Sequence, residues 1–221
     1  MNPRFIYLLY FFSGATALIY EVVWARKLGL IFGADAYGVG AVLAVFFMGL
    51  AAGSFIAGKW RFEAGKALRN YGLLEIGVGL YALFTPFIFK YFLQIVAGNL
   101  FLSPIMILIL SLIVLIVPTT LIGATFPTII KGVAGTRVGK RSGLLYGLNT
   151  LGAVVGAMLA GFWLVYFLGM DKTIWLTAVV NLAIGFMAIR ISVDNPESEF
   201  SDKAKKSCTT SLSYMKLFSS L

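Results

Sequence analysis

The sequence has no histidine and a single cysteine, Cys208, near its C-terminus. Without histidine there is no Ser–His–Asp triad, no Cys–His nucleophile and no histidine ligand for haem or zinc. With one cysteine the chain forms no internal disulfide and no cysteine-based zinc site. These absences exclude common hydrolase and metalloenzyme chemistries, and they predict a chain with no metal and no cofactor.

Charge is scarce as well, since Asp, Glu, Lys and Arg make up 12% of the 221 residues, against about 25% in soluble domains. Hydrophobic residues make up 60%, and the mean hydropathy is +0.92. A soluble chain of this size could not bury so much apolar surface in one core. The composition excludes an ordinary cytosolic enzyme and a disordered protein, and it predicts a chain surrounded mostly by lipid.

Six apolar segments are long enough to cross a bilayer as helices, which takes about 20 residues each. Their approximate bounds are Phe5–Phe32, Tyr37–Ala57, Tyr71–Tyr91, Pro104–Ile130, Leu144–Leu168 and Thr173–Ile191. We predict an all-α integral membrane protein, a six-helix transmembrane bundle over residues 1–191, similar to half of a major-facilitator-type transporter. In such a half the first and last three spans have inverted topology, although these two triplets show no convincing sequence self-similarity.

The basic residues predict the orientation of the bundle. Of 18 Lys and Arg, 14 lie before the first span, between spans two and three or four and five, or in the last turn of the sixth and beyond it. The positive-inside rule then places both termini in the cytoplasm, with the chain in the cell (inner) membrane. The net charge of +9 is therefore an orientation signal, and we expect no nucleic-acid partner.

The composition changes at residue 192, where a polar, Ser-rich and charged stretch begins. We predict a cytoplasmic tail over residues 192–221. Its last residues, Tyr214–Leu221, turn apolar again. They predict either the start of a further, truncated span or a short surface tail.

Span four contains two prolines and a glycine, Pro118, Gly123 and Pro127. Each proline removes a helical hydrogen bond and clashes with the preceding turn, so the sequence predicts a kink or break near Pro118. Freed carbonyls and the hydroxyls of Thr119 and Thr120 would then line a polar cavity. The alternative is a kink whose freed groups are satisfied by neighbouring helices.

An ionisable residue inside a span is a candidate functional group, and Glu21 is the main one in the first span. Tyr20 and Trp24 lie one helical turn apart beside it and could form a wall for a cationic ligand. Asn149 in span five could face the same interior. In the alternative interpretation, Glu21 forms a structural ion pair with a basic residue near the headgroups.

Glu75 lies about one turn inside the cytoplasmic end of span three, close in sequence to Arg61 and Arg69. We predict a cytoplasmic charge lock between these groups, with a ligand or proton site as the alternative.

Four stretches in spans one, two, four and five resemble the membrane-embedded spermidine-synthase-like proteins, also described as fused major-facilitator/spermidine-synthase proteins. They are Ser13–Arg26 (SGATALIYEVVWAR), Gly49–Ser54 (GLAAGS), Pro118–Pro127 (PTTLIGATFP) and Gly143–Ala153 (GLLYGLNTLGA). In that family a helical membrane region precedes, or is fused to, a cytosolic aminopropyltransferase domain. The glycine-rich loop and the acidic residue of such a domain are missing here, so we expect this chain not to be an enzyme.

Three functions remain open at this point. The resemblance implies a membrane domain that anchors or serves a soluble or fused polyamine aminopropyltransferase. That is the function we predict, and the alternative is a small-solute or cation (polyamine-like) transporter half acting as an oligomer, namely a homo-oligomer. The third alternative is a non-catalytic structural membrane subunit.

Overall fold

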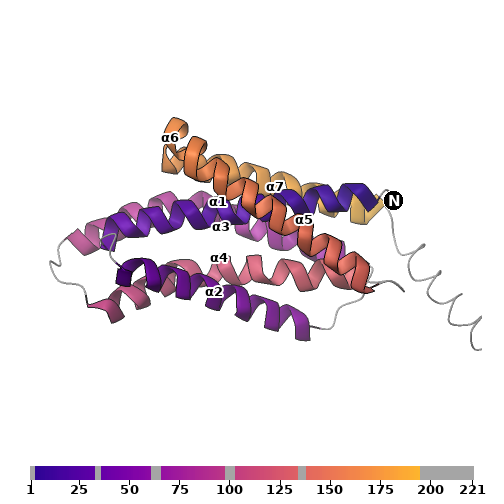
Figure 1. Ribbon diagram of the computed structural model, residues 1–221, viewed down its shortest axis with the longest axis horizontal. Helices are drawn as coiled ribbons and strands as arrows, with labels where there is room; N and C mark the ends of the chain where they lie inside the picture. The colour runs from indigo at the N-terminus through magenta and orange to yellow at the C-terminus, as the bar shows by residue number, and fades with distance from the viewer. Residues whose placement is uncertain (1–2, 33–35, 61–65, 98–102, 134–137, 195–221) are drawn as a thin grey trace, which may run out of the picture.

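The computed structural model of the protein describes residues 3–32, 36–60, 66–97, 103–133 and 138–194 (Figure 1). All regular structure in this part of the chain is helical. The elements are α1 (Pro3–Phe32), α2 (Ala36–Lys59), α3 (Ala67–Ala97), α4 (Pro104–Val133), α5 (Val138–Leu159), the π-helix η2 (Ala160–Leu164), α6 (Val165–Leu168) and α7 (Met170–Asp194).

Six helical segments of the described chain are long and apolar enough to cross a membrane, which confirms the predicted fold class. The fifth segment, Ser142–Leu168, is composite, because α5 continues through η2 into α6. Large apolar side chains such as Phe47, Phe84 and Phe162 lie exposed on the bundle surface. A surface of this kind is stable in contact with lipid, so the chain is a multi-pass membrane protein. Most of the proposed tail, including Tyr214–Leu221, lies outside the described residues.

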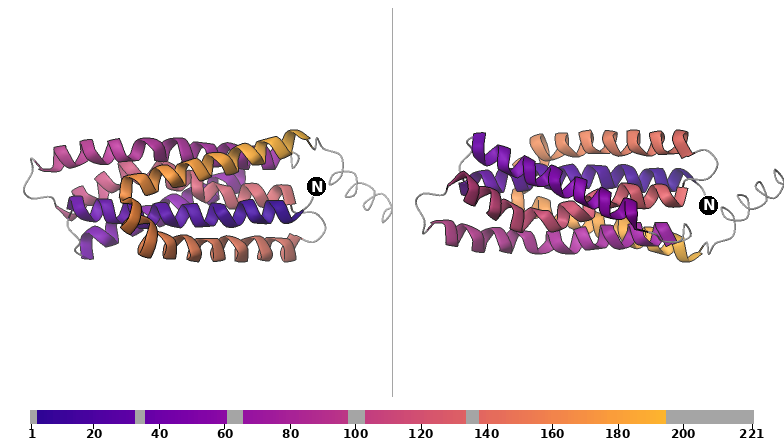
Figure 2. Two further views of the ribbon diagram at one scale, coloured as in Figure 1. Left: turned by 90° about the horizontal axis from the view of Figure 1, so that it is seen from above. Right: turned by 90° about the horizontal axis from the view of Figure 1, so that it is seen from below.

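The spans pack in two layers, one facing the viewer from above and the other from below in Figure 2. In one layer α1 packs against α5 and α7, and in the other α4 packs against α2 and α3. The layers meet chiefly where α3 crosses α7, and all the long helices run along the length of the molecule in both views of Figure 2. Because α1 and α4 are the central members of their layers, polar groups on them can lie deep in the bundle.

Glycines allow the closest helix pairs to form. A Cβ atom on Gly53 of α2 would lie 1.9 Å from the carbonyl oxygen of Thr120 in α4. A Cβ atom on Gly152 of α5 would lie 1.9 Å from the carbonyl oxygen of Phe11 in α1. No side chain fits in either space, so these small residues allow the helix backbones to touch, as is common in membrane bundles.

These two helix pairs are built alike. Gly123 of α4 faces the backbone of Leu50 in α2, just as Gly14 of α1 faces the backbone of Asn149 in α5. Residues that make equivalent contacts in α1 and α4 are always the same number of positions apart along the chain. The equivalent residues of α2 and α5 are also a constant number of positions apart. The matched pairs are Phe11 with Thr120, Gly14 with Gly123, Ala15 with Ala124, Leu50 with Asn149, and Gly53 with Gly152.

Helices α3 and α7 complete the repeat by packing against each other. Gly72 and Gly185 face each other's carbonyl oxygens across this contact, and Gly79 faces the carbonyl oxygen of Ala178. Since α3 and α7 are the third and sixth spans, they run in opposite directions. The first three spans and the last three therefore form an inverted repeat about a pseudo-twofold axis between α3 and α7, a symmetry that sequence comparison alone does not reveal.

The predicted break in span four is wrong, because α4 is one continuous helix that includes both Pro118 and Pro127. A proline leaves the carbonyl four residues earlier without its helical donor. The Tyr81 hydroxyl donates to the carbonyl of Val114 at 2.7 Å, and the Ser54 hydroxyl donates to that of Gly123 at 2.9 Å. Neighbouring helices thus satisfy both freed carbonyls, as the alternative interpretation had it.

Candidate functional site

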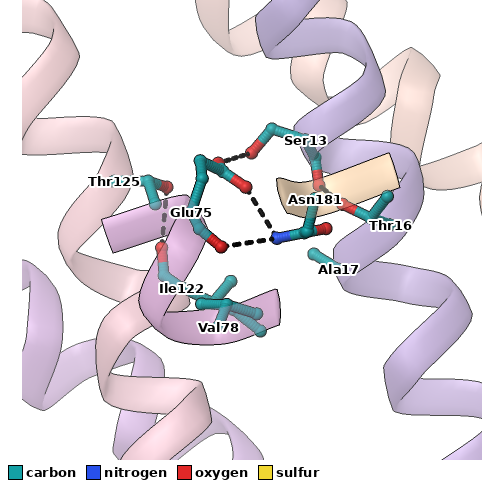
Figure 3. Close-up of a pocket in the computed structure, with 8 residues that line it drawn as sticks. All are labelled: Ser13, Thr16, Ala17, Glu75, Val78, Ile122, Thr125 and Asn181. Atoms are coloured by element: carbon teal, nitrogen blue, oxygen red, sulfur yellow. Dashed lines mark hydrogen bonds between the residues drawn. The ribbon is translucent and has the colours of Figure 1, made fainter. Parts of the chain in front are cut away.

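The carboxyl group of Glu75 lies at the centre of the bundle and is only 2% exposed. The Ser13 hydroxyl of α1 donates a hydrogen bond to its Oε1 at 2.5 Å. The Asn181 amide of α7 donates to Oε2 at 2.8 Å and, over 3.4 Å, to the Glu75 carbonyl oxygen (Figure 3). Neutral donors from two other helices thus hold this buried carboxyl group.

A small cavity adjoins this carboxyl group, with a volume of about 10 Å³. It lies where α1, α3, α4 and α7 meet (Figure 3). The lining residues are Ser13, Thr16, Ala17, Glu75, Val78, Ile122, Thr125 and Asn181. A cavity of this size admits about one water-sized body, so the site as it stands is closed to anything larger.

The pseudo-twofold axis runs through this cavity. Thr16 of α1 and Thr125 of α4 occupy matched positions, and each donates its hydroxyl to the carbonyl three residues earlier, that of Ser13 or Ile122. In α3 and α7, Gly72 corresponds to Ala178 and Gly79 corresponds to Gly185. The same spacing along the chain makes Asn181 the counterpart of Glu75. The carboxyl group of one repeat therefore meets the amide of the other on the axis.

Two further polar atoms near this centre have no hydrogen-bond partner within the described residues. They are Oδ1 of Asn181 and the hydroxyl oxygen of Tyr71, which lies one helical turn before Glu75. Both side chains are at least 98% buried. Buried polar atoms without partners are uncommon and call for an explanation, and of these two residues Asn181 lines the cavity.

The structure gives Glu75 different partners from those of the predicted charge lock. Arg69 is exposed, and it lies six residues before Glu75, which places it on another face of α3. Arg61 lies outside the described residues. An ion pair does join two other helices, between Lys27 of α1 and Asp171 of α7 at 2.5 Å.

Glu21 and its aromatic neighbours do not line the cavity. The Glu21 side chain is half-buried, and within the described residues it has no hydrogen bond or ion pair. Tyr20 and Trp24 are buried and stack with ring centroids 4.9 Å apart, while the Trp24 indole donates to Thr85 at 3.4 Å. The two aromatic rings therefore belong to the packed core of the bundle.

The other predicted site residues lie at helix–helix contacts. Asn149 lies against Gly14 where α5 meets α1, while Thr119 and Thr120 lie against Gly49 and Gly53 where α4 meets α2. The residues predicted to share one polar interior thus occupy separate places in the bundle and do not converge on one cavity.

Sequence reasoning did not place Ser13, Thr16, Thr125 and Asn181 in a site with Glu75. Each is buried, and each is a polar residue inside an apolar span, which is the signal that could have found them. Short hydroxyl residues are common in membrane helices because they can donate to their own backbone, so this signal alone is weak. It gains meaning only once the four helices are placed together.

Comparison with family models, with curated proteins and with solved structures finds no match. The functional argument therefore depends on the chemistry of the site itself.

Proposed function

We propose that this protein is a membrane transport module that binds a small cation at Glu75 and moves it across the bilayer. The observation that carries the proposal is a carboxyl group 2% exposed in the middle of a six-helix membrane bundle, held by a hydroxyl and an amide. Burying a carboxylate costs several kcal/mol unless a counter-charge compensates it. Such residues inside membrane spans are commonly those that bind ions or carry protons.

The position of Glu75 supports the same function. In transporters built from inverted repeats, the binding site lies near the bilayer midplane between the repeats. Glu75 and Asn181 meet between the two repeats, on the axis that relates spans one to three with spans four to six. A relative movement of the two layers would open this site to either end of the bundle.

The substrate class we propose is an organic amine of the polyamine kind, as the resemblance to spermidine-synthase-like proteins implies. A protonated amine donates hydrogen bonds and carries the charge that a carboxylate attracts. Because the cavity has a volume of only about 10 Å³, the layers must separate to admit such a ligand. The cavity is then the closed form of the site.

Uptake of radiolabelled putrescine and spermidine into proteoliposomes tests this proposal. Glu75→Gln keeps the size of the side chain and removes its charge, so we expect uptake to fall at least about tenfold, the factor for 1.4 kcal/mol. Glu21→Gln is the matched control, because that carboxylate also lies inside a span but does not line the cavity. Uptake by Glu75→Gln at the rate of the unmodified protein would refute the transport role of Glu75.

A second proposal follows from the resemblance itself, namely a membrane domain that serves a soluble or fused aminopropyltransferase. The four resembling stretches support it as a set, because they pair in space. Gly49–Ser54 packs on Pro118–Pro127, and the Ser13–Arg26 stretch packs on Gly143–Ala153. Co-purification of the detergent-solubilised protein with an aminopropyltransferase encoded beside it tests this role, and loss of that enzyme during washing in moderate salt would argue against it.

We further propose that both termini lie in the cytoplasm, from the distribution of basic residues. An even number of spans puts them at the same end of the bundle in any case. A reporter enzyme that is active only outside the cytoplasm, fused after residue 194, should be inactive, and an active fusion would reverse the orientation.

A further inference from the structure

The cavity beside Glu75 has an unusual balance of donors and acceptors. The hydroxyl protons of Thr16 and Thr125 are engaged by carbonyl oxygens of their own helices. The hydroxyl proton of Ser13 is engaged by Glu75, and the amide nitrogen of Asn181 donates twice to Glu75. A hydroxyl has one proton and an amide has two, so these lining side chains have no donor left for the cavity.

The polar groups that these side chains can still offer to the cavity are oxygen lone pairs. They belong to the Glu75 carboxylate, to the two threonine hydroxyls and to Oδ1 of Asn181, which has no partner within the described residues and is 98% buried. The lining side chains thus offer acceptors and no donors, which is complementary to a cation, and the nearest further hydroxyls, of Tyr71 beside Glu75 and of Tyr10 beside Thr125, do not line the cavity. Because Asn181 and Glu75 are matched in the two repeats, both halves of the protein supply ligands.

Size and charge narrow the choice of cation. The cavity volume of about 10 Å³ suits one body about as large as a water molecule. One carboxylate balances one positive charge, and no group of three His, Cys, Asp or Glu side chains gathers anywhere in the described chain. Oxygen ligands of this kind suit hard cations, whereas a divalent ion would retain a net charge in the membrane interior.

We infer that this cavity is a sodium site, which holds one dehydrated Na⁺ between Glu75, Asn181, Thr16 and Thr125. The inference rests on the proposed function, since it names a coupling ion at the same carboxylate. In this arrangement Na⁺ neutralises the buried charge while the layers are closed. A protonated amine replaces it, charge for charge, when the layers separate.

Thermal unfolding of the detergent-purified protein tests the site directly. At constant ionic strength, replacing choline by Na⁺ should raise Tm by about 3–5 °C once Na⁺ exceeds its Kd about tenfold, because an ion bound only by the folded state stabilises it. K⁺, which is larger, should give a smaller shift at equal concentration. An equal Tm in Na⁺ and in choline for the unmodified protein would overturn the inference.

Matched threonine variants locate the ion. Thr125→Val removes one cavity oxygen without changing the side-chain size, and we expect the Na⁺ concentration at half-maximal shift to rise at least about tenfold, as for other changes to a metal's surroundings. Thr128→Val is the control, because Thr128 is equally buried on the same helix and donates to Ala124 but does not line the cavity. Equal Na⁺ dependence in Thr125→Val and the unmodified protein would exclude the site.

The two proposals fail in different ways. If Na⁺ leaves Tm unchanged while Glu75→Gln abolishes amine uptake, the transport role stands and the sodium site is wrong. If Na⁺ stabilises the protein while Glu75→Gln transports normally, the sodium site stands and the transport role of Glu75 is wrong.

Discussion

Glu75 and Glu21 are both carboxylates inside predicted membrane spans, yet the structure treats them differently. Glu75 is 2% exposed and is held by donors from two other helices. Glu21 is half-buried and has no such partner in the described part of the chain. The comparison shows that depth along a span, which a sequence gives, does not determine the environment of a side chain, because the direction around the helix matters as much.

The glycines repeat this contrast within a single helix. Gly152 and Gly147 both lie in α5, but a Cβ atom on Gly152 would meet the backbone of α1, whereas one on Gly147 would meet nothing within 4 Å. In both comparisons two residues of the same type differ in how well they should tolerate substitution, because their side-chain positions face different neighbours.

The largest effect should come from Gly152→Leu. A side chain there must push α1 and α5 apart, since the obstacle is backbone and cannot change rotamer, so we expect a loss of at least about 3 kcal/mol, the upper end of overpacking. The yield of monodisperse protein and its Tm in detergent measure this. Gly147→Leu should behave like the unmodified protein, and equal behaviour of the two variants would contradict the close α1–α5 contact.

Glu75→Lys should follow in size. It removes the acceptor of the Ser13 and Asn181 hydrogen bonds and leaves a positive charge with no carboxylate to balance it, and an uncompensated buried charge costs about 3–5 kcal/mol. Glu21→Lys should cost less than about 1 kcal/mol, because a long side chain at a half-buried position can extend its amine to the membrane surface. Reversible unfolding in mixed detergent micelles compares the two, and a larger loss for Glu21→Lys would reverse the ranking of the two sites.

The smallest effect should come from Ser13→Ala, which removes one donor to Glu75 and leaves the shape of the site unchanged. Hydrogen bonds between membrane helices contribute about 0.6 kcal/mol on average and up to about 1.7, so we expect a loss in that range. Thr150→Val is the comparison, because Thr150 is exposed and donates to its own helix. A loss no greater than in Thr150→Val would mean that Ser13 contributes nothing to holding Glu75.

The six spans could be predicted from the sequence because their signal is local. A run of apolar residues long enough to cross the bilayer must form a helix, whatever its neighbours are, since lipid offers no partner to the backbone. Gly49 and Gly53 in span two, and Gly152 and Gly156 in span five, recur at four-residue spacing, a pattern typical of packing surfaces between membrane helices. The sequence does not show which helices these residues join, because nothing next to Gly53 or Gly152 indicates that they pack on α4 and α1.

The site could be predicted only in part. Glu75 was recognised as an ionisable residue in a span, but basic residues close in sequence suggested a charge lock that the fold does not form with Arg69. Ser13 and Asn181 are far from Glu75 along the chain, and only the packing of α1 and α7 on α3 brings them to it. The predicted break at Pro118 failed for the same reason, because its freed carbonyl has a donor on another helix, the hydroxyl of Tyr81.

By itself, then, the sequence determined that the chain is a six-span helical membrane protein, because hydrophobicity and span length act on each segment separately. Only the tertiary structure decided that the six spans form an inverted repeat, and that Glu75 rather than Glu21 lies at its centre. The physical reason is that a buried polar group needs partners, and in this protein they come from helices that meet only after the bundle has packed.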